Sequence, residues 1–118
     1  MEQGGIAMDE RVMIVEGKTD RDRLQGILAE PVKILCTYGT YSSGRAEKLK
    51  EEIDPAAELF IFTDEDESGK KLRKLLQDDF PDAIHLHTRK EFAEVANTPP
   101  EVLAEILAGE GFLVKVIT

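Results

Sequence analysis

Short apolar runs alternate along this chain with longer stretches in which apolar residues recur every three or four positions. The short runs predict four strands, at Arg11–Glu16, Val32–Cys36, Glu58–Thr63 and Ala83–His87. The longer stretches predict helices, whose expected inward-facing residues are Leu24, Ile27, Leu28, Ala46, Leu49, Ile53, Leu72, Leu75 and Leu76. Strands that alternate with helices are typical of an α/β domain in which helices flank a mostly parallel, four-stranded sheet.

Capping residues predict where two of the helices begin. Thr19, with Asp22 three residues later, is the expected N-cap of the first helix. Thr98, in "TPPEVLAEILAG", is the expected N-cap of a helix that ends at Gly109.

The remaining segments carry weaker patterns. Residues 1–10 lack a basic flank followed by an apolar block and are predicted to be a flexible leader. No element is predicted for residues 88–97, and the tail "FLVKVIT" is a candidate for an extra edge strand. A single domain is therefore expected over residues 11–118, a length typical of one domain.

Composition narrows the setting. No apolar run approaches the roughly 20 residues that span a bilayer, so no membrane contact is expected. Cys36, the only cysteine, lies in an apolar run and is predicted to belong to the core of a protein in the reducing cytoplasm. The net charge of −9 argues against strong non-specific binding to nucleic acid, which depends on Lys and Arg. A nucleic acid held through metal ions and a local basic patch remains compatible with it.

Acidic residues follow two of the predicted strands. Glu16 ends the first strand, and Asp64 and Asp66 follow the third, in "IFTDEDESGK". Ligands of open α/β sheets bind at the carboxyl ends of the strands. If these two strands are neighbours, the three carboxylates share one crevice, where their repulsion is relieved by a hard divalent cation. The pattern therefore predicts a magnesium site.

Two glycines accompany these acids. Gly17 and Gly69 follow or close the acidic turns, where a side chain is expected to crowd a ligand or to forbid the backbone angles. The paired pattern, E-G at one strand end and D-x-D-x-x-G at another, is more specific than either glycine alone.

The segments "VMIVEGKTD" and "FIFTDEDESGKKLR" resemble the Toprim domain. That domain is shared by topoisomerases, bacterial primases, overcoming-lysogenization-defect nucleases and recombination mediator proteins. The resemblance covers about Arg11 to His87, and "YGT" at Tyr38 to Thr40 lies where the family often has a glycine. It is strongest for small stand-alone Toprim proteins and for the nuclease that matures 5S ribosomal RNA.

The resemblance implies a Rossmann-like fold and a role for each acid. Glu16 matches the family's general acid or base, which also touches the metal, and Asp64 and Asp66 match its magnesium-binding pair; Mn²⁺ is the expected substitute ion. Ser68 stands where topoisomerases often have a third aspartate, which favours the primase and nuclease branches. Neither a catalytic tyrosine domain nor a zinc-binding segment accompanies the motif, so topoisomerase or complete primase activity is not expected.

Other interpretations of the acids make different predictions. Asp64 and Asp66 can form a solvated turn that caps the third helix. An EF-hand loop is excluded, because its twelfth position, counted from Asp64, is Leu75 rather than glutamate. A receiver-like signalling domain, with Asp64 as phosphoacceptor, carries an acidic pair after its first strand; this chain has Glu16-Gly17 there.

Basic residues near the acids have two interpretations. The candidates for contact with a phosphate backbone are Lys18, Arg21, Lys70 and Lys71, with Arg73 beside them. Lysines in the first turn of a helix oppose its dipole by roughly 0.3–1 kcal/mol each. Either Lys70 and Lys71 bind a phosphate, or the preceding acids compensate for their unfavourable interaction with the helix dipole. His85 and His87 share one strand face and are predicted to be partly buried histidines.

The function predicted is magnesium-dependent chemistry on nucleic-acid phosphodiesters, by a small nuclease or a processing subunit in RNA processing or DNA repair. The alternative is a non-catalytic module that binds metal and either a nucleic acid or a protein partner, which then supplies recognition. The sequence leaves RNA and DNA both open as partners.

Overall fold

The computed structural model describes residues 10–39 and 41–115. Strands β2 (Arg11–Val15), β3 (Lys33–Cys36), β4 (Glu58–Thr63) and β5 (Ile84–His87) form one sheet. All three strand pairs are parallel, and the order across the sheet is β3-β2-β4-β5. The helices are α1 (Lys18–Ile27), α2 (Ser43–Glu52), α3 (Glu67–Asp79) and α4 (Pro100–Gly109), with a short 3₁₀ helix η1 (Val95–Asn97). The predicted α/β class and four-stranded sheet are confirmed.

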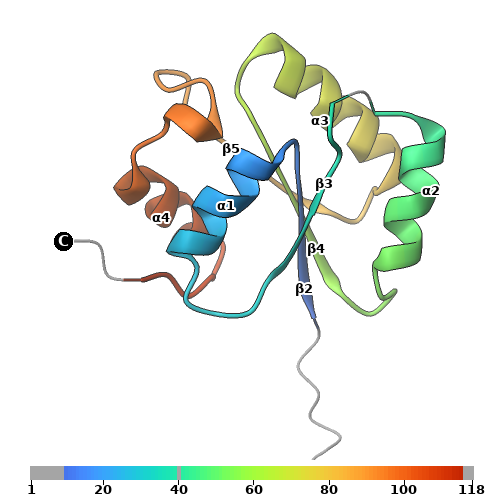
Figure 1. Ribbon diagram of the computed structural model, residues 1–118, viewed down its shortest axis with the longest axis horizontal. Helices are drawn as coiled ribbons and strands as arrows, with labels where there is room; N and C mark the ends of the chain where they lie inside the picture. Colours follow the sequence, from blue (N-terminus) through green and yellow to red (C-terminus); the bar gives the residue numbers. More distant parts are fainter. Residues whose placement is uncertain (1–9, 40, 116–118) are drawn as a thin grey trace, which may run out of the picture.

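The sheet lies between two helical layers, α1 with α4 on one face and α2 with α3 on the other (Figure 1). Side chains of β2 alternate between the two cores, as the pleat of a strand requires. Met13 and Val15 pack with the α1 and α4 side, whereas Ile14 packs with Leu49 and Leu72 on the other side. The continuous apolar strands are therefore buried on both faces.

Strands β2 and β4 are neighbours at the centre of the sheet, in register from Arg11 opposite Glu58 to Ile14 opposite Ile61. Both strands run in the same direction, so their carboxyl ends meet at one edge of the sheet. The fold thereby satisfies the condition on which the predicted metal site depends.

The predicted cap of α1 is wrong. The N-cap is Gly17, and Thr19 lies within the first turn. Asp20, rather than Asp22, reaches back to the cap, where its carboxylate accepts a hydrogen bond from the Gly17 amide at 3.2 Å. Several residues at this turn can cap a helix, and the early bend of the chain after β2 selects the earliest one.

Two predictions about the later helices are also wrong. The N-cap of α4 is Pro99, and the Thr98 hydroxyl instead donates to the Glu94 carbonyl at 2.7 Å. Leu75, expected to face inward, is 49% exposed. The buried face of α3 is narrow and runs through Leu72 and Leu76.

The tail does not add a strand to the sheet within the described residues. Val114 forms an isolated antiparallel bridge with Leu28, at the end of α1. Residues 116–118, and the predicted leader up to residue 9, lie outside the described part of the chain. No helix in the part of the chain that is described has the length and apolarity needed to cross a membrane. Cys36 is buried, as predicted.

Candidate metal centre

Three carboxylates converge at the carboxyl edge of the sheet. Asp64 follows β4, Asp66 is the N-cap of α3, and Glu94 immediately precedes η1. One oxygen from each lies within 4.8 Å of the others. The predicted aspartate pair therefore shares its site with a third acid from a segment for which no element was predicted.

Each of these carboxylates accepts a hydrogen bond from the protein. The donors are the Val95 amide for Asp64 (2.8 Å), the Gly69 amide for Asp66 (2.7 Å) and the Asn97 side chain for Glu94 (2.7 Å). The protonated Glu16 carboxyl also donates a hydrogen bond to Asp64. Three carboxylates held in this way suit a hard divalent cation that keeps several of its waters.

Two further acids border this group. Burial, and then the neighbouring Asp64 carboxylate, raise the pKa of Glu16 to about 7. Burial and Asp64 also raise the pKa of Asp20 to about 6, although its hydrogen bond from the Gly17 amide opposes the rise. Glu16 is adjacent to Asp64 but is not one of the three carboxylates within 4.8 Å of one another, so its contact with metal stays a prediction.

Asp64 is the most deeply placed of these acids, with 9% of its surface exposed. Its burial raises its pKa, as does the charge of Asp66. Ionised carboxylates in partly desolvated surroundings repel one another strongly. A bound cation would remove that repulsion, and this donor set of oxygens alone is the kind that Mg²⁺ or Mn²⁺ prefers.

The structure explains why a glycine is needed at position 69 but shows no such need at position 17. A Cβ on Gly69 would lie 2.2 Å from the Asp64 carbonyl oxygen, because the start of α3 packs directly against the end of β4. Gly17 has an extended backbone (φ −143°), and beyond its two chain neighbours no atom of the described residues lies within 4 Å of the place that its Cβ would take. The expected backbone requirement is therefore wrong at Gly17. The expectation that Gly17 leaves room for a ligand stays a prediction.

Contacts with the end of β4 fix the loop that carries Glu94. The Ala93 carbonyl accepts hydrogen bonds from the Glu65 amide (2.6 Å) and from the Thr88 hydroxyl (2.7 Å). Ala93 itself has a positive φ of 60°. These tertiary contacts, rather than a regular element, bring Glu94 to the aspartates.

Sequence reasoning missed Asp20 and Glu94. A signal existed for Asp20, because it lies four residues after Glu16 at the start of a helix, within the quoted "VEGKTD". No pattern in the sequence distinguishes Glu94 from the nearby Glu91.

Glu65 turns away from the metal centre and into a basic group. Its carboxylate lies 2.9 Å from an Arg73 nitrogen, 3.1 Å from His87 Nδ1 and 3.9 Å from Lys70 Nζ. The Arg73 hydrogen bond is the largest of the effects that lower the pKa of Glu65. His85 shares its strand face with the exposed His87 and is only partly exposed, and its burial lowers its pKa.

The structure places the predicted nucleic-acid contacts at the starts of α1 and α3. Lys18 and Lys71 are exposed. Lys70 is exposed too and lies near Glu65, whereas Arg21 pairs with Asp22 at 3.5 Å. All four lie beside the acids at the same edge of the sheet, and their contact with nucleic acid stays a prediction.

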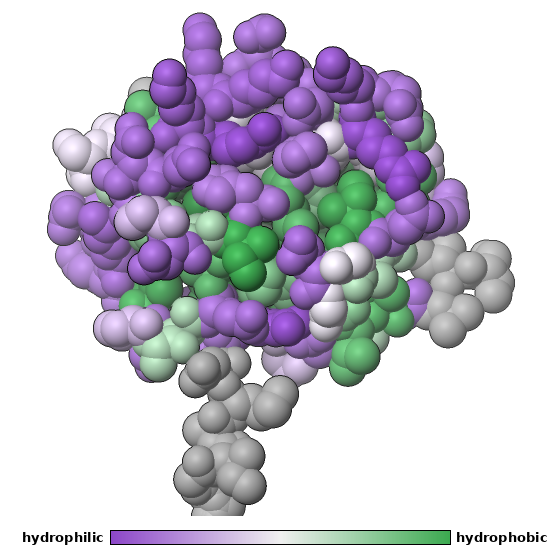
Figure 2. All heavy atoms as spheres, turned by 180° about the vertical axis from the view of Figure 1, so that it is seen from behind, coloured by the Kyte–Doolittle hydropathy of each residue, from purple (hydrophilic) through white to green (hydrophobic). Residues whose placement is uncertain are grey.

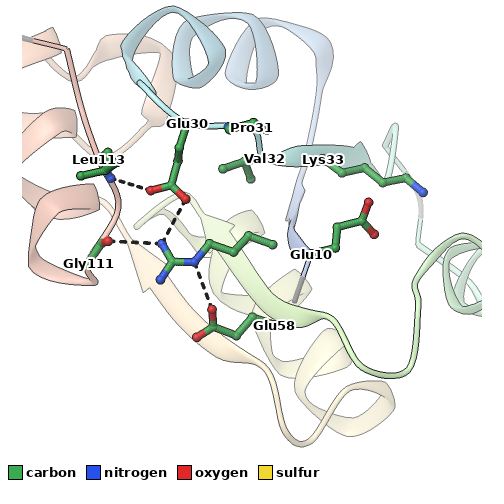
Figure 3. Close-up of a pocket in the computed structure, with 9 residues that line it drawn as sticks. Glu10, Glu30, Pro31, Val32, Lys33, Glu58, Gly111 and Leu113 are labelled. Atoms are coloured by element: carbon green, nitrogen blue, oxygen red, sulfur yellow. Dashed lines mark hydrogen bonds and ion pairs between the residues drawn. The ribbon is translucent and has the colours of Figure 1, made fainter. Parts of the chain in front are cut away.

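A pocket of about 980 Å³ lies at the amino ends of β2, β3 and β4, at the edge of the sheet opposite the acids; Figure 3 shows its lining residues. There Arg11 pairs with Glu58 at 3.0 Å and Glu30 at 3.5 Å and lies over the Phe112 ring. These contacts join β2 to the segment that follows α4, so we interpret the residues around this pocket as stabilising the fold. Figure 2 shows hydrophilic side chains over the upper part of the face in view and hydrophobic ones gathered across its middle and lower part.

The Toprim domain family matches residues 11–95 of the chain. The small TOPRIM domain protein from Bacillus stearothermophilus is a structural neighbour, with a TM-score of 0.85 and 38% sequence identity over 93% of this chain and 96% of that one. The uncharacterized protein YusF of Bacillus subtilis is 45% identical over 83% of this chain and 66% of its own length.

Proteins named ribonuclease M5 are also similar. The one from Ligilactobacillus salivarius (strain UCC118) is 31% identical over 82% of this chain and 56% of its own length. The one from Mycoplasma mycoides is 37% identical over 58% of this chain and 38% of its own length. The chain thus spans between 38% and 66% of these curated relatives.

Proposed function

This chain belongs to the Toprim domain family, and we propose that it is a magnesium-dependent nuclease that cleaves phosphodiester bonds in RNA. The observation that carries the proposal is the convergence of Asp64, Asp66 and Glu94 beside Glu16. The similarity to proteins named ribonuclease M5 supports RNA as the substrate.

Asp64, Asp66 and Glu94 are the residues that would hold the ion, each through a carboxylate oxygen. A magnesium ion bound there would polarise the phosphate and offset the charge of the leaving oxygen. The carboxylates are fixed before a substrate arrives, because hydrogen bonds from the protein hold them in place.

Glu16 would move the proton. Its pKa of about 7 means that the carboxyl is protonated in about half of the molecules near neutral pH. A group in that state can accept a proton from an attacking water or give one to a leaving oxygen. Bound metal would lower this pKa and favour the role of base.

Asp20 would support Glu16. It lies in the same crevice, and its hydrogen bond from the Gly17 amide fixes the turn that follows Glu16. We infer that Asp20 keeps the negative charge around Glu16 high and thereby helps Glu16 to retain its proton near neutral pH.

The second candidate is a module that binds metal and either RNA or a protein partner without turnover. The net charge of −9, with 24 acids against 15 bases, favours the protein partner, because strong binding to nucleic acid depends on Lys and Arg. The chain also spans only part of the curated relatives, so similarity alone does not bring the activity of the whole relatives to it.

Cleavage of structured RNA, single-stranded DNA and plasmid DNA, each with magnesium or manganese, tests the proposal. We expect metal-dependent cleavage of RNA and a loss of about a hundredfold or more in Glu16→Gln and Asp64→Asn. Glu94→Gln should also lose activity, whereas Glu91→Gln, in the same loop but outside the cluster, should keep it.

Two outcomes would contradict the nuclease. Cleavage that persists in Glu16→Gln and Asp64→Asn would point to a contaminating enzyme. RNA binding that requires magnesium but yields no product, with the fold of every variant intact by circular dichroism, would support the binding module.

A further inference from the structure

An exposed aromatic side chain stands beside the metal centre, at the carboxyl end of the edge strand β3. Tyr38 is 56% exposed, the second most exposed of the large hydrophobic side chains that the described residues present. Its amide donates a hydrogen bond of 2.9 Å to the Glu16 carbonyl. Tyr38 is therefore attached one strand away from Glu16 and two strands away from Asp64.

Tyr38 occupies a backbone conformation that a tyrosine seldom adopts. Its φ is +55°, in the left-handed region where glycine and asparagine are favoured. The ring contributes little to the core, given its exposure. Because Tyr38 keeps this unfavourable conformation although its ring is exposed, we interpret the ring as a group that binds a ligand.

Two arginines flank the ring. The Arg21 guanidinium, from α1, lies 3.5 Å from the Tyr38 hydroxyl, and the Arg45 guanidinium carbon, from α2, lies 5.9 Å from the ring centroid. The contact at the hydroxyl orients the ring. The contact at Arg45 is at the outer limit of a cation–π interaction, so that side chain can turn to a ligand at small cost.

We propose that Tyr38, Arg21 and Arg45 form a platform that binds an unpaired nucleotide of a single-stranded nucleic acid next to the metal centre. The base stacks on the Tyr38 ring, and the guanidinium groups bind the adjoining phosphates. A base in a duplex has no free face to offer, so the platform selects single strands. The inference rests on the proposed function, since bound metal must offset the nearby carboxylates before a phosphate can approach.

The row of strand ends gives the nucleic acid a path. In the order β3-β2-β4 the strands are followed by Tyr38, then Glu16, then Asp64. Neighbouring strands are about 4.8 Å apart. A strand of nucleic acid that lies across this edge would hold one base on the ring while an adjoining phosphodiester reaches the carboxylates.

Binding is measured in the Glu16→Gln background with magnesium, so that the probe stays intact. The probes are a short labelled single-stranded RNA, the DNA of the same sequence, the RNA annealed to its complement, and an abasic strand that keeps the phosphates. Tyr38→Ala should weaken binding of the RNA about tenfold to a hundredfold, the worth of one stacked base. It should leave binding of the abasic strand unchanged.

Three further variants separate stacking from folding and from charge. Tyr38→Phe keeps the stacking face but loses the hydroxyl that Arg21 contacts, so it should bind the RNA more tightly than Tyr38→Ala and at most a few-fold more weakly than the parent. Tyr38→Gly relieves the left-handed backbone, so its melting temperature should rise while its affinity falls. Arg45→Gln should weaken binding of the RNA and of the abasic strand alike. It should also reduce the dependence of log affinity on log salt by about 0.7 for each phosphate that the protein no longer neutralises.

Preference for the single strands over the duplex supports the platform, whether the RNA is bound more tightly than the DNA or equally. Equal affinity for the duplex overturns it, as does unchanged RNA affinity in Tyr38→Ala, which would leave the ring to a protein partner. The two proposals can fail separately. Tyr38-dependent binding without cleavage by the parent protein removes the nuclease only, and Asp64-dependent cleavage with Tyr38-independent binding removes the platform only.

Discussion

Glu65 lies between two residues of the metal centre in the sequence but faces the opposite way. Asp64 and Asp66 face Glu94, while Glu65, in the bend between β4 and α3, faces Arg73 on α3 and His87 at the end of β5. One acid of the motif stabilises the fold while its neighbours form the site.

Glu65→Ala should destabilise the protein without harming the metal centre. The Glu65 and Arg73 side chains are 12% and 23% exposed, so removing the carboxylate leaves a partly buried guanidinium without its main partner. We expect a loss of about 1–2 kcal/mol in the free energy of unfolding, measured with urea. Glu47→Ala, on α2, is the control and should change it by less than about 0.5 kcal/mol. If the metal centre is intact, magnesium should still raise the Tm of Glu65→Ala. A Tm that does not respond to magnesium in this variant would contradict the assignment.

At the scale of elements, the junction of β4 with α3 shapes the site. The first turn of α3 lies against the Asp64 carbonyl, and its Gly69 amide holds the Asp66 carboxylate. A side chain at position 69 would push the helix away from the strand. Both aspartates would then move relative to Glu94.

Alanine substitutions at glycines can distinguish the effect of close packing on the unfolding free energy from the effect of helix propensity. Alanine normally stabilises a helix relative to glycine by about 1 kcal/mol. Gly69→Ala should instead destabilise by about 1–3 kcal/mol, because its Cβ would lie 2.2 Å from a backbone oxygen. Gly26→Ala, inside α1 and with open space around its Cβ, is the matched control, and it should leave the unfolding free energy unchanged or raise it by up to about 1 kcal/mol. Stabilisation by Gly69→Ala in urea would show that the helix does not pack this closely.

For the whole molecule, the clustered acids make stability depend on pH. The pKa of Glu16 is about 7 in the folded chain and near its ordinary 4.5 when unfolded. The folded chain thus binds this proton more tightly, and its stability falls as the pH rises through 7. His85, whose pKa is lowered by burial, acts in the opposite sense as the pH rises through 6.5, and so offsets part of this fall.

Between pH 6.5 and 8 without metal we therefore expect the protein to lose up to about 0.5 kcal/mol, after allowance for His85 and for solvent screening. This corresponds to a fall of about 1–3 °C in Tm, measured by calorimetry. Glu16→Gln should flatten the slope. Magnesium should raise Tm more at pH 8 than at pH 6.5, because it binds the ionised carboxylates, and Asp64→Ala should abolish that increase. A Tm that rises from pH 6.5 to 8 in the metal-free parent would contradict the assignment.

The sequence alone determined the strands, the α/β class and the place of Glu16, Asp64 and Asp66 at strand ends. Those features depend on local hydrophobic period and on the residues that directly follow each strand, and both can be read along the chain. Only the tertiary structure decided that Glu94 joins the site, through a loop whose Val95 amide bonds to Asp64 across 31 residues. Contacts of that kind arise from packing between distant segments, and no pattern in either segment encodes them by itself.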